Sequence, residues 1–319
     1  MQNRVKVVCI GHTTTDNLIK YDGTCRFEST GGAGVYAASG ASYWGSDHDV
    51  GLVTRLGSSY NQSCIEHIRG HRAINDAGMV PMDKKGIHLW LLYDADGYRH
   101  WVIHHDSCSR EEATPVPSEI PEGFKEARGF HFSPLPLYPL TELINTLPED
   151  AWIQVDPHYE WFFPEYREEW ERILRRVSVV LPSEDEFTKF FDIPLAFDID
   201  NYKKHMRELS AMGPPIVVLK MGPQGAILYL KDEDVFYSIP SCAEHVVDVT
   251  GAGDSFCGSL LYNYVSGDDI ITAAIKGMVG SSITLENTSA DDNFHVAEGV
   301  AMERFRRVEA SIREKIKIL

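Results

Sequence analysis

Cysteine pairs, long apolar runs and basic runs are missing from this 319-residue chain, and each absence excludes a class of protein. The six cysteines form no C-x-x-C pair, which argues against zinc and redox modules and indicates free thiols in a reducing, cytoplasmic setting. The first apolar run, Val7–Ile10, is too short for a signal-peptide core or a membrane span. Lys and Arg total 30 against 47 Asp and Glu, a net charge of −17, so neither nucleic acid nor a membrane is an expected partner.

Sequence repeats and long linkers are also missing. The segment 114–121, with three prolines, is typical of a surface connection rather than a domain boundary. The chain is 43% hydrophobic and 24% charged, which is the composition of a globular protein that can bury a sizeable core. A single domain over residues 1–319 is the prediction.

Short β-branched runs alternate with amphipathic stretches along most of the chain. Because strands joined through helices usually lie parallel, this pattern predicts an α/β fold, a doubly wound and mostly parallel sheet flanked by helices. The predicted strands are Val5–Ile10, Val50–Thr54, Gly129–Phe132, Trp152–Asp156, Val177–Leu181, Ile216–Lys220, Ala226–Leu230 and His245–Asp248. The predicted helices are Gly34–Trp44, Ser63–Gly70, Leu137–Asn145, Glu165–Arg175, Glu184–Phe191, Asn201–Met212, Asp254–Val265, Asp269–Thr284 and one from Val296 to near the C-terminus.

Two segments break this alternation. In Gly86–His105 two apolar and aromatic runs flank D-A-D-G, where Gly97 supplies the positive φ of a hairpin turn. A weaker hairpin surrounds Asp22-Gly23. We expect the two hairpins, about residues 13–30 and 86–106, to form a small antiparallel β lid inserted in the core; an edge extension of the main sheet is the alternative. Apolar side chains on both faces of the Gly86–His105 hairpin predict a homodimer through the lid.

A strand, a Gly-Ala-Gly turn and a helix are predicted within His245–Gly258. Without side chains at Gly251 and Gly253, backbone N–H groups can approach an anion, and the helix start adds the positive end of its dipole. Asp254 would repel a phosphate bound there, but it can accept the proton of an alcohol that attacks the phosphate. An isolated G-A-G-D more often only caps a helix, so this interpretation depends on the rest of the chain.

Five motifs resemble those of the ribokinase, or PfkB-type, carbohydrate kinases. D-V-T-G-A-G-D at 248–254 resembles the D-T-x-G-A-G-D signature, with Val at the second place. G-H-T-T-T-D at 11–16 is similar to the first strand end with its sugar-binding Asp, and G-G-A-G at 31–34 to the N-terminal G-G motif. P-S-E-D-E at 182–186 stands where the family has P-N-x-x-E, and K-M-G-P-Q-G at 220–225 where it has K-x-G-x-x-G.

The resemblance extends from residue 5 to about 290 and implies a ribokinase-like fold. It also implies transfer of the γ-phosphate of ATP, with Mg²⁺, to a hydroxyl of an unphosphorylated sugar, polyol or inositol-like alcohol. The matched positions then have these roles: Asp254 as the base, with Gly251, Ala252 and Gly253 as the anion hole; Asp16, Gly31, Gly32 and Gly34 on the acceptor; Lys220, Gly222, Gly225 and Thr250 on the nucleotide; Glu186 on Mg²⁺ through water; and Asp248, with Thr250, on the K⁺ that some members hold.

Departures from the family pattern concern the acceptor more than the phosphate. Tyr36 stands where the G-G motif usually has Asn, Ser183 replaces the Asn of P-N-x-x-E, and His158 replaces the Asn of V-D-x-N-x-R, whose Arg is also lost. A phosphorylated acceptor would need two or more cations near the G-G motif, where the sequence offers only Lys20 and Arg26.

Two alternatives remain open. One is a nucleoside kinase of the same fold, in which an aromatic side chain of the lid stacks on the base; the candidates are Trp90, Tyr93, Tyr98 and Trp101. The other is a non-catalytic member that binds a nucleotide or sugar as a regulatory signal. Retention of Asp254 counts against the second, because a binding protein has no need of a base.

Other features predict no site. His100, His104 and His105 have a spacing that does not bring three imidazoles to one point on a strand, so a metal site is not expected there. Gly11 has no G-x-G-x-x-G around it, which excludes the usual nicotinamide fingerprint. Arg110 is interpreted as a solvated loop residue, with a contact to a substrate anion as the alternative.

Overall fold

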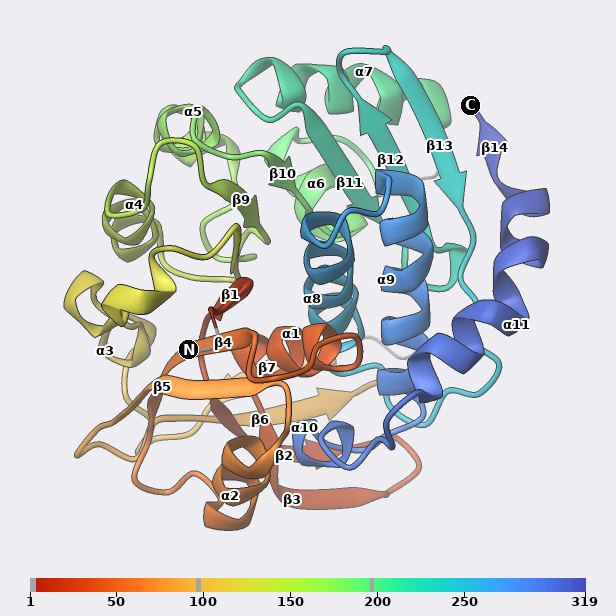
Figure 1. Ribbon diagram of the computed structural model, residues 1–319. Helices are drawn as coiled ribbons and strands as arrows, with labels where there is room; N and C mark the ends of the chain where they lie inside the picture. The colour runs from red at the N-terminus through yellow and green to blue at the C-terminus, as the bar shows by residue number, and fades with distance from the viewer. Residues whose placement is uncertain (1–3, 96–98, 196–197) are drawn as a thin grey trace.

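A computed structural model describes residues 4–95, 99–195 and 198–319, which fold around a ten-stranded sheet (Figure 1). In spatial order its strands are β14 (Lys317–Ile318), β13 (Val235–Ile239), β12 (Ala226–Leu230), β11 (Ile216–Lys220), β10 (Val179–Val180), β9 (Trp152–Val155), β8 (Gly129–Phe132), β1 (Val7–Ile10), β4 (Val50–Leu56) and β5 (Ile74–Pro81). The seven strands that lie from β11 to β5 in this spatial order pair with their neighbours in parallel. The pairs β11–β12, β12–β13 and β13–β14 are antiparallel. The predicted mostly parallel sheet is confirmed.

Helices cover both faces of this main sheet. One face carries α1 (Ala33–Ser42), α8 (Ala252–Val265), α9 (Ile270–Leu285) and α11 (Val300–Lys315), and Figure 1 shows α8 and α9 side by side across it. The other face carries α4 (Leu137–Asn145), α5 (Arg167–Leu174), α6 (Glu184–Phe190) and α7 (Ile199–Ala211). The other helical elements of the described residues are α2 (Gln62–Gly70), α3 (Arg110–Ala113), α10 (Ala290–Asn293), and the 3₁₀ turns η1 (Pro117–Glu119), η2 (Glu122–Phe124), η3 (Pro164–Tyr166) and η4 (Gly222–Gln224).

Strand β1 shows why a continuous apolar run was needed at the centre of the sheet. Successive side chains of a strand point to opposite faces. Val8 and Ile10 pack in the core on the α4–α7 side, whereas Val7 and Cys9 pack on the side of α1 and α8. All four are fully buried, as expected for a strand covered on both faces.

The two predicted hairpins form a separate four-stranded sheet, which we call the small sheet. Its order is β3 (Cys25–Gly31), β2 (Thr14–Ile19), β6 (Ile87–Tyr93) and β7 (Arg99–Ile103). Each hairpin is antiparallel, and the inner strands β2 and β6 pair in parallel. The turn residues Asp96 and Gly97, and Tyr98 beside them, lie outside the described residues.

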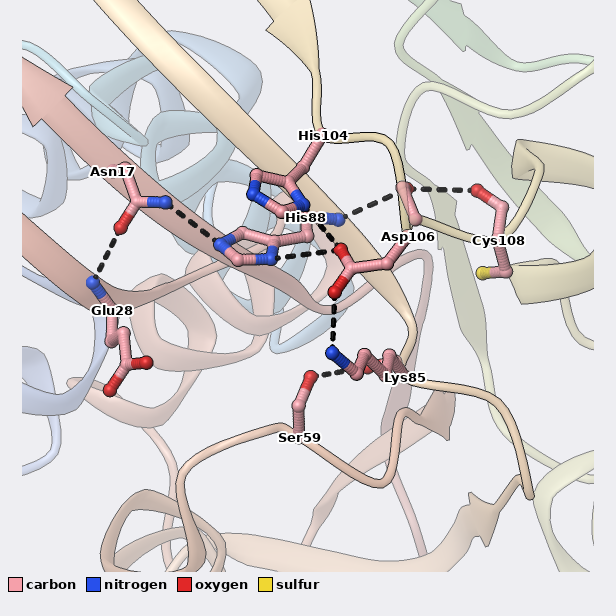
Figure 2. A network of polar contacts seen from close by, with 9 residues as sticks. Asn17, Glu28, Ser59, Lys85, His88, His104, Asp106 and Cys108 are labelled. Atoms are coloured by element: carbon pink, nitrogen blue, oxygen red, sulfur yellow. Dashed lines mark hydrogen bonds and ion pairs between the residues drawn. The ribbon is translucent and has the colours of Figure 1, made fainter.

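A polar network fastens the strands of the small sheet to one another (Figure 2). The Glu28 N–H donates to Asn17 Oδ1 at 2.9 Å, which orients the Asn17 amide so that its Nδ2 donates to His88 Nε2 at 2.8 Å. The neutral His88 ring therefore carries its proton on Nδ1, which lies 3.5 Å from Asp106 Oδ1. His104 Nδ1 contacts the same oxygen at 2.5 Å.

No metal site is expected from the spacing of His100, His104 and His105, and in the structure His100 and His104 contact different carboxylates. His100 Nε2 lies 2.8 Å from Asp94 Oδ2. His88, His104 and Asp106 do bring ligand-type atoms within 4.8 Å of one another. Lys85 pairs with the second carboxylate oxygen of Asp106, so hydrogen bonds and an ion pair already occupy that carboxylate.

Between residues 245 and 265 a predicted strand and the predicted start of a helix are both wrong. Residues 245–248 form no strand: Val246 and Val247 are exposed, and the Val247 N–H donates to the Leu285 carbonyl at the end of α9 rather than to a neighbouring strand. The β-branched run there covers the end of a helix. Helix α8 begins at Ala252, two residues before the predicted Asp254, because Gly251 is its N-cap. No helix among the described residues is long and apolar enough to cross a membrane.

Candidate active site

One cavity of about 280 Å³ lies between the small sheet and the main sheet. It opens at the carboxyl ends of the parallel strands, where His12 follows β1, Asp156 follows β9 and Lys220 ends β11. Eight residues assigned from distant motifs line it together: Asp16, Gly32, Glu186, Lys220, Thr250, Gly251, Gly253 and Asp254.

The Gly-Ala-Gly turn presents backbone amides to this cavity. Gly251 has φ +77°, and a Cβ built on it would lie 2.2 Å from ring carbons of Tyr36, so only glycine fits there. The first hydrogen bond within α8 runs from the Ser255 N–H to the Gly251 carbonyl at 2.9 Å. The N–H groups of residues 252–254 precede that bond and lie at the positive end of the helix dipole. This arrangement can bind a phosphate.

Gly253 faces a lysine. A Cβ built on Gly253 would lie 3.6 Å from Lys220 Nζ, an ordinary contact distance. The Lys220 ammonium thus lies beside the first turn of α8, where it adds positive charge next to the backbone N–H groups.

Lys220 also pairs with an acid that the sequence analysis did not assign. Its Nζ lies 2.5 Å from Asp156 Oδ2, and Asp156 is 3% exposed. Burial raises the pKa of Asp156 to about 6 against the opposing effect of Lys220. Burial, and then the Asp156 charge, raises the pKa of Glu186 to about 7. Asp156 follows β9 and Lys220 ends β11, and β10 lies between these two strands. The signal in the sequence was a polar residue at the end of each apolar run.

Carboxylates of the type that binds Mg²⁺ line this cavity, although they do not meet around one point. Asp156, Glu186 and Asp254 supply carboxylate oxygens, the ligand type that this ion prefers, and their charges exceed that of Lys220. Glu186 Oε2 accepts the Ser183 N–H at 2.7 Å, and Ser183 Oγ accepts the Glu186 N–H in return, so a capping box at the start of α6 holds the carboxylate at the cavity.

Three stacked rings, which we call the aromatic wall, also line the cavity. Trp101 stacks on Tyr159 with ring centroids 6.0 Å apart, and Tyr159 stacks on His158 at 4.6 Å. Trp101 comes from β7 of the small sheet, whereas the other two follow β9. Tyr159 was not predicted, because nothing in its own segment shows that β7 approaches it.

The histidines and the arginine near the aromatic wall supply little free positive charge to the cavity. Burial, followed by the charge of Arg110, lowers the pKa of His12 to about 3 and that of His158 well below its usual value, so both rings are neutral at pH 7. Arg110 lines the cavity, but its Nε lies 3.2 Å from Glu160 Oε2. The prediction that Arg110 is a solvated loop residue is wrong, since its side chain is only 11% exposed.

Several assigned glycines lie beside the cavity rather than in its lining. A Cβ on Gly31 would meet Asp16 Oδ2 at 2.2 Å, so Gly31 gives room to that carboxylate. Gly34 packs on the backbone of Gly11, which brings α1 against β1. Gly222 and Gly225 have φ of +54° and +94° and form the turn between β11 and β12. Ala252 contributes only its backbone at the start of α8.

Sequence comparison decides the family. The chain matches the family described as pfkB family carbohydrate kinase over residues 4–296. The chain belongs to this family. It is therefore a phosphotransferase with an alcohol group as acceptor.

Known relatives of this pfkB-family kinase include nucleoside and sugar kinases. A cytidine kinase of Thermococcus kodakarensis is 29% identical over 262 residues, 82% of this chain and 89% of the relative. The structure of Burkholderia thailandensis nucleoside kinase in complex with inosine has a TM-score of 0.77 at 17% identity and covers 95% of this chain and 98% of that one. A putative ribokinase II from E. coli, in complex with ATP and Mg²⁺, has a TM-score of 0.72 at 18% identity, covering 95% and 99%. The last two comparisons confirm the ribokinase-like fold.

Proposed function

We propose that this kinase transfers the γ-phosphate of ATP to a hydroxyl of an unphosphorylated nucleoside. The observation that carries the proposal is one cavity lined both by Asp254 with the amide turn and by the stacked rings of Trp101 and Tyr159. The similarity to a cytidine kinase over most of both chains, and to the fold of a kinase bound to inosine, supports the same class of acceptor.

Asp254 acts as the general base. Its carboxylate takes the proton of the acceptor hydroxyl while the oxygen forms a bond to the γ-phosphorus and the bond to the β-phosphate oxygen breaks, with ADP as leaving group. The N–H groups of the Gly-Ala-Gly turn and the Lys220 ammonium face the charge that develops on the transferred phosphoryl group.

Mg²⁺ bound near Glu186 and Asp156 would neutralise the β- and γ-phosphates and bring the cavity, rich in carboxylates, to a charge that accepts ATP. Lys220 holds Asp156 in place beside that site through the 2.5 Å ion pair.

Asp16 and the aromatic wall would bind different parts of the acceptor. A carboxylate can accept hydrogen bonds from both hydroxyls of a vicinal diol, which suits Asp16 to the ribose, and the aromatic wall can stack on a planar base. A sugar, polyol or inositol-like acceptor is the second candidate; the cavity volume of about 280 Å³ favours it, because this is at the small end for ligand pockets.

An ADP-release assay tests the proposal, with cytidine, uridine, adenosine, inosine, ribose and myo-inositol as acceptors. We expect magnesium-dependent turnover with at least one nucleoside, at a kcat/KM above that for ribose and inositol. Asp254→Asn should bind ATP and lower kcat by about 10²–10⁴, since the base is lost. Asp185→Asn, which alters an exposed carboxylate paired with Lys189, is the matched control.

Three outcomes would contradict parts of the proposal. Turnover with ribose or inositol alone would establish the second candidate. An Asp254→Asn rate within threefold of wild type would remove Asp254 as base. ATP binding without turnover on any acceptor would favour a regulatory member.

We also propose a homodimer through the outer face of the small sheet, with the sheet acting as a lid over the acceptor. Phe27, Trp90 and Val102 share that outer face, and Phe27 and Val102 are 58% and 45% exposed. On the inner face Leu89 and Leu91 are buried, whereas their β7 partners Ile103 and Trp101 are 58% and 38% exposed.

A further inference from the structure

An arginine from outside the family signature, Arg26, contacts the first residue of that signature, Asp248, next to the Gly-Ala-Gly turn. Asp248, three residues before Gly251, is buried with a side chain 4% exposed. Its Oδ1 accepts the Thr250 N–H at 2.9 Å, and its Oδ2 pairs with Nη2 of Arg26. Arg26 comes from β3 of the small sheet, more than 200 residues away in sequence.

We propose that the Arg26 side chain substitutes for a free monovalent cation in this kinase. Its positive charge keeps the Gly-Ala-Gly turn at 251–253, which we call the phosphate-binding turn, in position. The inference rests on the proposed function and names a positioning residue for it. Arg26 reaches the turn only through Asp248.

The guanidinium occupies a site made of oxygen atoms from two chain segments. Besides Asp248, it donates through Nη1 to the Thr288 carbonyl, in the loop that follows α9. A carboxylate and a backbone carbonyl are the oxygen ligands that a metal cation would take. The fork of Arg26 satisfies both at once, so the site already contains its cation.

A buried carboxylate at this place requires compensation. Removing one partner of a buried ion pair leaves an uncompensated charge, which is strongly unfavourable. Here that charge would also lie next to the Gly-Ala-Gly turn and would oppose the binding of another anion. Arg26 therefore acts on two properties, the position of the turn and its electrostatic potential.

Two further side chains of the small sheet contact the same turn. Lys20 Nζ donates to the Val247 carbonyl at 3.0 Å, and the Tyr93 hydroxyl lies 3.0 Å from Thr250 Oγ1. With Arg26, three residues from three strands or their ends connect the acceptor-side sheet to the phosphate-binding turn. Arg26 is the member of this group that supplies a cation to a carboxylate.

Monovalent-cation dependence is the decisive experiment. The wild-type rate should be the same within twofold in potassium chloride and in tetramethylammonium chloride. Arg26→Ala should lower kcat by about 10- to 100-fold in tetramethylammonium. Potassium or guanidinium ions should restore at least about tenfold of that loss, and Arg26→Lys should retain most of the activity without added potassium. Arg69→Ala, which removes a surface partner of Asp76, is the control and should respond to neither ion.

A second measurement does not depend on turnover. Potassium should raise the melting temperature of Arg26→Ala by at least about 2 °C relative to tetramethylammonium and leave that of wild type unchanged, because only the variant has an open cation site. A wild-type protein without turnover on any acceptor would contradict the proposed function, and the melting temperatures would still test Arg26.

Potassium activation of the wild-type enzyme would overturn the inference. So would full activity of Arg26→Ala in tetramethylammonium, or a loss of activity that no cation and no lysine restores. The last result would make Arg26 a packing residue only.

Discussion

His131 is a titratable residue in the middle of the main sheet, on β8, with no exposed surface. Its Nδ1 lies 3.1 Å from Gln154 Nε2, which also donates to the Cys257 carbonyl at 2.8 Å. Burial, and then the nearby charge of Lys220, lowers the pKa of His131 from 6.5 to about 3. Between these two values the unfolded chain binds a proton that the folded chain does not.

The free energy of unfolding should therefore fall as the pH is lowered below about 6.5, by up to about 1.4 kcal/mol per pH unit from this residue. Asp156 and Glu186 have raised pKa values and act in the opposite direction, so the wild-type slope alone does not isolate His131. His131→Asn removes the titration. We predict that the difference in free energy of unfolding between wild type and His131→Asn narrows from pH 6 to pH 4.5, measured by urea denaturation.

His245→Asn, which replaces an exposed histidine, is the matched control for the substitution. A constant difference between wild type and His131→Asn would show that His131 is protonated in the folded chain or shielded in the unfolded one.

At the scale of elements, the turn before α8 contains two glycines that the structure separates by function. Gly251 has positive φ and contacts the Tyr36 ring, whereas Gly253 is helical and faces Lys220 across the cavity. We predict that Gly251→Ala lowers the free energy of unfolding by roughly 2–4 kcal/mol, from backbone strain and overpacking. Gly253→Ala should keep or slightly raise it, because alanine favours the helix.

Gly253→Ala should lose activity although it keeps its stability. Its new methyl group would lie where the phosphate is proposed to bind, so kcat/KM for ATP should fall by about tenfold or more in a stably folded protein. Thermal unfolding and steady-state kinetics on the two variants check both halves. A Gly253→Ala enzyme with wild-type kinetics would place the phosphate elsewhere.

The turn could be predicted from the sequence because its signals are local: two glycines, a helix start and an acid within a few residues. The strand predicted at 245–248 was wrong because β-branched residues also cover helix ends, and local pattern does not show whether a sheet neighbour exists. Strands β5 and β13 were missed, since both lie at or near an edge of the sheet and their partly exposed side chains interrupt the apolar run.

Pairings across the sheet were less accessible than motifs. Asp156 and Lys220 meet because β9, β10 and β11 are neighbours in space, an order that no spacing in the chain states. Arg26 meets Asp248 for a similar reason, since β3 lies beside the loop after α9 only once both sheets are assembled. Sequence motifs identified the groups that we propose bind phosphate, and the structure shows which charged side chains contact them.

At the scale of the whole molecule, the small sheet has two faces that require two partners. Trp101 pairs with Leu91 across β6 and β7 and lies on the inner face, where it lines the cavity and stacks on Tyr159. Trp90 pairs with Val102 and lies on the outer face, beside Phe27 at 6.1 Å. In the proposed arrangement the same hairpin offers one tryptophan to the acceptor and another to a second copy of the chain.

Separate substitutions should divide the two roles. Trp90→Ser should shift the protein from dimer to monomer at micromolar concentration and leave the acceptor KM within about threefold of wild type, because exposed aromatic area is lost only from the outer face. Trp101→Ser should keep the dimer and raise the acceptor KM by about 5- to 100-fold, since stacking on a base is worth about 1–3 kcal/mol. Sedimentation velocity and acceptor titrations measure the two effects. A wild-type monomer would refute the dimer, and an unchanged KM in Trp101→Ser would remove the aromatic wall from acceptor binding.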